Sequence, residues 1–219
     1  IQVLLRLVSS SVPANLLDSD QMNEIQANAA EALANLTSTY GEENAAQLHS
    51  LGVAPLVLMC GSGNLQVRRH AALVLGNVSQ SDEHRAAIGL RGGVEALVYL
   101  CEKEDDVTRA NALWALGNLA WHPMNQDRVG RFFSQLVALC ESVWLPVRTN
   151  AMVCLANALF YNDKNRRRVE NLKGGVATIV RQCATARDVP QPVQEAALRA
   201  LVSLSYTDRM VLVLGREEP

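Results

Sequence analysis

Residues 108–119 read Thr-Arg-Ala-Asn-Ala-Leu-Trp-Ala-Leu-Gly-Asn-Leu, and four other stretches of the 219-residue chain align with them without a gap. These stretches are residues 25–36, 67–78, 147–158 and 193–204. Three columns of the alignment are uniform or nearly so: Ala29, Ala71, Ala112, Ala151 and Ala197; Leu33, Leu75, Leu116, Leu155 and Leu201; Asn35, Asn77, Asn118 and Asn157, with Ser203 in the last copy. Self-similarity of this kind indicates one structural unit used several times.

The spacing within and between the copies predicts the kind of unit. In the third copy, Ala112, Leu116 and Leu119 lie four and three residues apart, which places them on one face of a helix. The copies begin 39 to 46 residues apart, and helical repeats of about 40–47 residues are typical of HEAT and armadillo solenoids. Gly76 and Gly117, just before the Asn column, each cost a helix roughly 1 kcal/mol relative to Ala. We therefore expect a neighbouring helix to pack closely against them.

A glycine turn precedes three of the long helices. Residues 52–57, 92–98 and 174–180 match one another, and each begins with Gly followed by Val and further apolar residues. Glycine at this point breaks the chain between a short first helix and a second helix. The repeat that runs through residues 131–133 (Arg-Phe-Phe) lacks these glycines, so we expect an irregular first turn there.

The order of short helix, glycine turn, second helix, polar loop and long third helix resembles the armadillo repeat. The Gly-Gly-Val turns and the string Ala-Leu-Trp-Ala-Leu-Gly-Asn-Leu-Ala at residues 112–120 carry the resemblance, which covers essentially the whole chain. It implies an all-α, armadillo-type right-handed α-solenoid with three helices per repeat. We expect a single domain over residues 1–219, with about four complete repeats and a partial repeat at each end. The partial repeats span 1–40 and 207–219, and the complete repeats span approximately 43–80, 82–122, 124–161 and 163–206. Because both end repeats are cut, we expect the chain to be part of a longer one.

Composition excludes several classes of partner. The net charge is −2 and the isoelectric point is near 6.1, so no bulk attraction to nucleic acid or to an anionic membrane is expected. The sequence has no run of about 18 apolar residues that could insert into a membrane. Aromatic residues make up only 5% of the chain against 49% hydrophobic residues, which suits a core of Ala, Leu and Val between closely packed helices.

Four of the five cysteines share one column of the repeat. Cys60, Cys101, Cys140 and Cys183 each follow a repeated apolar position by four residues. Equivalent positions in stacked repeats lie about 10 Å apart, whereas a disulfide needs Cα atoms within about 7 Å. We expect reduced, mostly buried thiols and a reducing compartment. We therefore expect a cytoplasmic location, with nuclear or cytoskeletal association left open.

The resemblance also implies a binding surface. In armadillo proteins the third helices line a concave groove, and a ladder of Asn side chains hydrogen-bonds the backbone of an extended peptide. An alternative is that these amides bond only the backbone of the neighbouring repeat. On this basis the candidate groove residues are Asn35, Asn77, Asn118 and Asn157 in the ladder, and Glu31, His70, Asn111, Trp114, Asn150 and Arg199 one or two turns earlier.

These features favour a non-enzymatic scaffold or adaptor that binds an extended peptide or helix of a partner protein. One alternative is a nuclear-transport fragment similar to importin-α, but only Trp114 with Asn118 matches that family's repeated Trp-x-x-x-Asn pattern. Another is a regulatory armadillo segment of a larger protein. The four histidines occur singly, and no phosphate loop or nucleophile elbow is present. We therefore expect no catalytic, cofactor or metal site.

Two groups of basic residues have simpler explanations than ligand binding. Residues 164–168 (Lys-Asn-Arg-Arg-Arg) fall on a short first helix, so we expect a solvated face, with a phosphate or acidic-partner site as the alternative. Arg68, Arg109 and Arg148 form a column at the start of three long helices. We expect the long stems of these arginines to pack along the next repeat.

Overall fold

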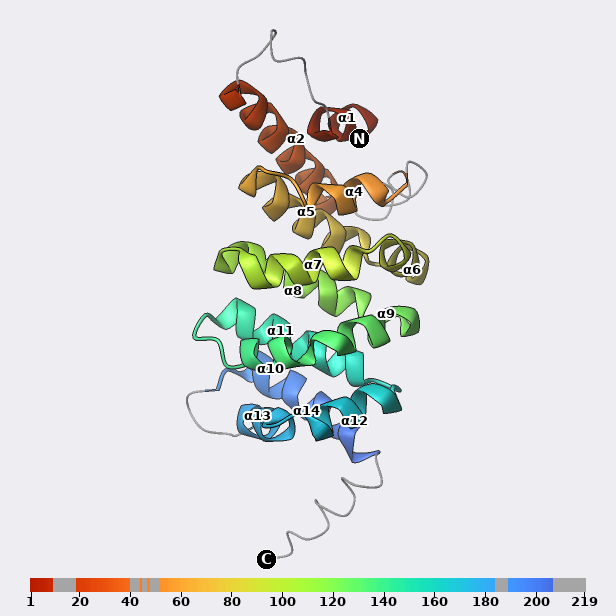
Figure 1. The fold of residues 1–219 in the computed structure, drawn as a ribbon, viewed down its shortest axis with the longest axis vertical. Helices are drawn as coiled ribbons and strands as arrows, with labels where there is room; N and C mark the ends of the chain where they lie inside the picture. Colours follow the sequence, from red (N-terminus) through yellow and green to blue (C-terminus); the bar gives the residue numbers. More distant parts are fainter. Residues whose placement is uncertain (10–18, 40–43, 45–46, 48–51, 184–188, 207–219) are drawn as a thin grey trace, which may run out of the picture. The chain divides into compact units, whose positions relative to one another are not determined.

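The computed structural model describes residues 1–9, 19–39, 44, 47, 52–183 and 189–206. All the regular secondary structure within these ranges is helical (Figure 1). The all-α solenoid class is therefore confirmed. The chain divides into two compact units, Ile1–Ala115 and Leu116–Pro219, and the boundary falls within helix α8 (Asp106–Leu119). Each unit is described by itself. The division into repeats across the whole chain stays a prediction, and the expected partial repeat at 207–219 lies outside the described residues.

Unit 1 is built from short helices that alternate with the long helices of the aligned stretches. In chain order its helices are α1 (Gln2–Ser9), α2 (Ser19–Thr39), α4 (Ala54–Met59), α5 (Leu65–Val78), α6 (Asp82–Leu90), α7 (Gly93–Lys103) and the first part of α8. The long helices α2 and α5 pack along each other, and α4 packs against α5. Helices α6, α7 and α8 follow one another as a short helix, a second helix and a long helix.

Unit 2 continues the same pattern. After the end of α8 come α9 (Pro123–Val129), the 3₁₀ helix η1 (Gly130–Phe132), α10 (Phe133–Leu139), α11 (Leu145–Leu159), α12 (Asp163–Asn171), α13 (Gly175–Cys183) and α14 (Gln191–Ser205). Helix α11 packs against α14 and α10, and α13 packs against α14. The short 3₁₀ segment occupies the place of the glycine turn, so the irregular turn expected at residues 131–133 is confirmed.

The uniform columns of the alignment form the core. All five members of the Ala column are buried, as are Leu33, Leu75, Leu116 and Leu155, while Leu201 is half-buried. Long helices can approach closely across the Ala column because a methyl group takes little room. The glycine turns also have their expected geometry, since φ is +86° at Gly52, +82° at Gly92 and +80° at Gly174. Side chains other than glycine rarely adopt this conformation.

The two helix-interior glycines differ in what they touch. A Cβ at Gly76 of α5 would collide with the indole ring of Trp114 from α8. A Cβ at Gly117 would lie 3.6 Å from the Cα of Cys154 in α11, an ordinary van der Waals contact. The expected close approach is therefore confirmed at both positions. At the first the neighbour is a side chain, and at the second it is mainly backbone.

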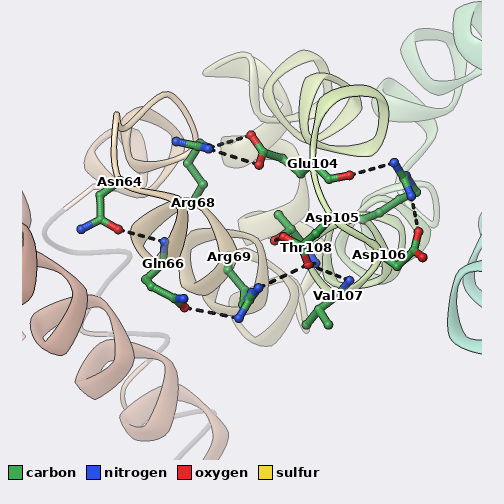
Figure 2. A network of polar contacts seen from close by, with 10 residues as sticks. Asn64, Gln66, Arg68, Arg69, Glu104, Asp105, Asp106, Val107 and Thr108 are labelled. Carbon is green, nitrogen blue, oxygen red and sulfur yellow. Dashed lines mark hydrogen bonds and ion pairs between the residues drawn. The ribbon is translucent and has the colours of Figure 1, made fainter.

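A network of polar contacts joins successive repeats in unit 1 (Figure 2). Arg68 on α5 donates to both carboxylate oxygens of Glu104, at 2.7 and 3.1 Å. Arg69 donates to Asp105 at 3.3 Å, and Asp105 caps the start of α8 by accepting from the backbone of Val107. Arg68 thus reaches the next repeat as expected. The guanidinium of Arg109 bonds the carbonyls of Cys101 and Glu104, which precede α8 in the chain.

All five cysteines are free thiols, and all are buried except the half-buried Cys183. Burial raises the pKa of Cys60 and of Cys101 to about 12, because the thiolate would lose its hydration. Among the described residues no helix combines the length and apolar character needed to cross a membrane. In the same part of the chain, no three or more His, Cys, Asp or Glu side chains are grouped to hold a metal ion.

Candidate partner-binding site

In unit 1, the long helices α2, α5 and α8 carry six of the candidate groove residues. Glu31 and Asn35 on α2 are exposed; His70 and Asn77 on α5, and Asn111 and Trp114 on α8, are half-buried. The Asn77 amide nitrogen lies 3.0 Å from the hydroxyls of both Thr37 and Ser38 on α2, and 3.4 Å from the carbonyl of Ala34. Its donors are therefore directed at the preceding long helix.

The charge state of the half-buried His70 is influenced by its burial. Its Nδ1 atom is buried and has no hydrogen-bond partner among the described residues. Burial lowers the pKa of His70, because the charged imidazolium would lose hydration; Glu31 opposes this and Arg69 adds to it. Burial therefore favours the neutral form of the imidazole.

In unit 2, Asn157 is fixed from both sides of its amide group. Its side chain is buried, with a relative exposure of 2% for the residue. Its nitrogen donates to the carbonyl of Gly117 at 2.9 Å, and its oxygen accepts from the guanidinium of Arg199 on α14. The donor is thus used on the backbone of the preceding repeat, which is the alternative role considered for the ladder. Asn118 and Asn150 are half-buried.

Beside Asn157 lies a cavity of about 360 Å³. Three aromatic residues of its wall sit three positions after the ladder column in successive copies: Trp121, Phe160 and Tyr206. The rings of Trp121 and Phe160 meet edge to face, with centroids 5.6 Å apart. Aliphatic side chains of α14 complete an apolar wall, so the cavity combines exposed rings with the end of the polar ladder. Its lining residues are Trp121, Ala156, Asn157, Phe160, Tyr161, Arg166, Leu198, Arg199, Val202, Ser203 and Tyr206.

Two arginines bring positive charge to this cavity. The guanidinium of Arg199 lies over the Trp121 ring, 5.8 Å from its centroid, and that of Arg166 lies over the Tyr206 ring at 5.7 Å. Contacts of this type attract a cation to the ring face. Arg166 is buried and pairs with Asp163 at 2.7 Å.

The expected solvated face at residues 164–168 is therefore wrong for Arg166, which turns inward to the cavity. Lys164 and Arg168 pair with Asp127 of α9 at 2.9 and 2.6 Å, while Arg167 is exposed. Hydrogen bonds from Lys164 and Arg168 and their positive charges hold the pKa of Asp127 below its ordinary value, and its partial burial opposes them. Most of this basic run is thus engaged in contacts within its own unit.

Comparisons with known proteins agree with this architecture. A model of the HEAT-like repeat matches residues 66–119. Among curated proteins, no sequence matches the chain. An engineered protein solved by the Northeast Structural Genomics Consortium is 30% identical over 93% of this chain and 78% of its own, with a TM-score of 0.79. The chain belongs to the armadillo/HEAT-type repeat family.

Further solved structures share the fold of this family member. A second engineered protein from the same consortium is 25% identical, covers 98% of this chain and 85% of its own, and has a TM-score of 0.81. A designed armadillo repeat protein in complex with the peptide (KR)4 is 22% identical over 92% of this chain and 80% of its own, with a TM-score of 0.76. At that identity the likeness concerns the fold alone.

The cavity of this armadillo/HEAT-type chain contains only two of the candidate groove residues, Asn157 and Arg199. The aromatic column was not predicted from the sequence, because Trp121 and Phe160 lie just beyond the ends of the aligned stretches. A signal was available, since Trp121, Phe160 and Tyr206 keep the same offset of three residues from the ladder. That the ten candidate residues form one binding surface remains a prediction.

Proposed function

We propose that this protein is a non-enzymatic scaffold that holds a segment of a partner protein against its long helices, with the cavity of α11 and α14 as an anchoring point. The armadillo/HEAT-type fold is generally one of protein-interaction scaffolds. The observation that carries the proposal is the grouping of exposed rings and an arginine around one 360 Å³ cavity. Aromatic residues and Arg are the side chains that most often dominate protein interfaces.

A linear segment suits this cavity better than a whole domain. Its volume is at the low end of the roughly 300–1,000 Å³ range of ligand pockets, which is room for anchoring side chains. A designed armadillo protein of the same fold binds the peptide (KR)4, which supports peptide binding as a mode. A lysine-rich segment is disfavoured at this cavity, because the positive charge of Arg199 would repel it. A cytoplasmic location remains part of the proposal, and the five free thiols support a reducing compartment.

The proposal is tested by affinity capture from native cell extract, with the wild-type chain as bait beside three variants. The first is Trp121→Ala/Phe160→Ala, which removes the aromatic wall. The second, Trp114→Ala/Asn118→Ala, alters the groove position predicted from sequence. The third, Tyr99→Ala, removes an aromatic side chain that is 52% exposed on α7, and it serves as the matched control.

We expect the first variant to lose the captured partner and the control to retain it. In a titration of the purified partner, loss of a central aromatic anchor weakens binding by about 2 kcal/mol or more, which is about 30-fold. Unchanged melting curves establish that each variant is folded. Retention of the partner by the first variant together with loss by the second would move the site away from the cavity. Retention by both would contradict the proposed function.

A further inference from the structure

We propose that the cavity of α11 and α14 recognises a partner segment in which an Asp or Glu stands next to a large apolar residue. The carboxylate binds Arg199, and the apolar side chain lies against Trp121 and Phe160. This inference rests on the proposed function and names the chemical class of its partner.

The charge of Arg199 is the first observation. Its guanidinium bonds the neutral oxygen of Asn157 and lies over the Trp121 ring, and no carboxylate pairs with it among the described residues. Glu195 stands one turn earlier on α14, but it accepts from Gln191 at 2.8 Å instead. No Asp or Glu is among the described residues that line the cavity. Arg199 is exposed at the cavity wall and has no carboxylate partner among the described residues, so its charge is open to a partner molecule.

The second observation is that Arg199 is held in place. Asn157 accepts from it, and Asn157 is itself buried and fixed by its bond to the carbonyl of Gly117. The Trp121 ring supports the guanidinium from one side. A guanidinium has five N–H donors in a fixed fork that matches a carboxylate. Because the arginine is already ordered, a partner carboxylate binds with a smaller loss of conformational entropy.

The third observation is the apolar surface beside the arginine. Trp121 and Phe160 are 42% and 43% exposed, and Leu198 and Val202 on α14 are 52% and 57% exposed. All four line the cavity. Large apolar side chains grouped in this way mark a site of interaction. A carboxylate alone would leave this surface in water, so the partner needs an apolar residue next to its acid.

The number of charges favours a carboxylate over a phosphate. Arg166 is already paired with Asp163, so among the described lining residues the cation without a carboxylate partner is Arg199. A phosphorylated side chain carries about −1.5 to −2 charges and is recognised by clusters of arginines. A single Asp or Glu carboxylate matches the single guanidinium in charge and in geometry.

The test uses a library of random heptapeptides displayed with a blocked C-terminus, so that only side chains supply carboxylates. The library is selected on the purified 219-residue chain, and the selected peptides are titrated by fluorescence anisotropy. We expect Asp or Glu next to Leu, Ile, Phe or Trp to be enriched. Replacing that acid by its amide, or changing Arg199→Gln, should weaken binding roughly tenfold or more, as for loss of a charged hydrogen bond.

The matched control is Arg167→Gln, which removes the same charge from an exposed position on α12. It should leave the affinity unchanged. The charge reversal Arg199→Glu should turn the preference of the selection from acidic to basic peptides. Thermal unfolding of each variant checks that the fold is intact.

Each remaining outcome has a distinct meaning. Peptides that need Trp121 and Phe160 but no acid would overturn the inference and leave the scaffold function standing. Preference for phosphorylated over carboxylate peptides would also overturn it. If no peptide is retained better by the wild type than by Trp121→Ala/Phe160→Ala, then the cavity does not take a linear segment at all, and both proposals fall.

Discussion

At the scale of single residues, Gly76 and Gly117 share a column of the repeat but meet different neighbours. Gly76→Ala would force the Trp114 ring from its place, and we expect this crowding to cost roughly 1–3 kcal/mol of stability. Gly117→Ala meets only ordinary contacts. There the gain in helix propensity should dominate, with stabilisation of up to about 1 kcal/mol.

Urea unfolding of both variants, followed by far-ultraviolet circular dichroism, checks this pair. The two glycines are controls for each other, because the helix-propensity term is the same in both. Equal shifts of the unfolding midpoint would mean that the ring of Trp114 does not rest on Gly76.

The thiols give a second prediction at this scale. In the native protein, the half-buried Cys183 should react first with a disulfide reagent, and the buried thiols slowly. Cys183→Ser should remove the fast phase, and denaturant should expose all five thiols. A fast phase that survives in Cys183→Ser, or a total of three or fewer in denaturant, would contradict the assignment.

The raised thiol pKa values also predict a loss of stability in alkali. The pKa of Cys60 and of Cys101 is about 12 in the folded protein, against about 8.5 for an exposed thiol. The unfolded chain therefore loses these protons at lower pH. Their contribution to stability is complete below about pH 8.5 and is lost as the pH rises towards 12. Urea midpoints measured from pH 8 to pH 11 should fall, and they should fall less in Cys60→Ala than in the wild type.

At the scale of the helix, Asp105 decides how α8 begins. It accepts from the backbone of Val107 at 3.0 Å and of Thr108 at 3.2 Å, and Arg69 donates to it. Asp105→Ala should cost about 1 kcal/mol, as for other N-caps. Asp106→Ala, which changes an exposed neighbour in the same helix, should stay within about 0.5 kcal/mol of the wild type. Chemical denaturation at pH 7 measures both.

The same cap has a predictable pH dependence. Burial works to raise the pKa of Asp105, but hydrogen bonds from Thr108 and the Arg69 charge hold it below its ordinary value. The contribution of the carboxylate to stability is therefore present above about pH 4, the ordinary range for Asp. It is lost as the pH falls through the lowered value. The stability difference between the wild type and Asp105→Asn should shrink in acid, and a constant difference would contradict the role of the charge.

Much of the fold could be predicted from the sequence at the scale of single helices and turns. The Ala column requires close packing and the glycine turns require positive φ, and these local constraints were sufficient to predict the helices and the irregular turn near Arg131. The site was less predictable. Whether the amide of Asn157 faces a ligand or the preceding repeat depends on the distance between two helices, which the sequence does not encode locally. The inward turn of Arg166 likewise depends on its packing beside Tyr206.

At the scale of the whole molecule, a repeat protein transmits a local change mainly to neighbouring repeats. Ala71 is fully buried on α5, and Ala71→Leu should cost roughly 1–3 kcal/mol by overpacking. Hydrogen exchange followed by mass spectrometry should show faster exchange in α2 and α5, with little change in α14. Ala197→Leu, the equivalent change on α14, should give the reverse pattern. Uniform acceleration in both variants would indicate that the chain unfolds as one cooperative block.

The position of Trp121 beneath Arg199 has an optical consequence. An indole emits light whose wavelength and intensity depend on the charges and water around it. When a ligand draws the guanidinium away from the ring, or covers the ring itself, the emission of Trp121 must change. With Trp114 and Trp144 replaced by Phe, the molecule would report the occupancy of its own cavity without any attached dye.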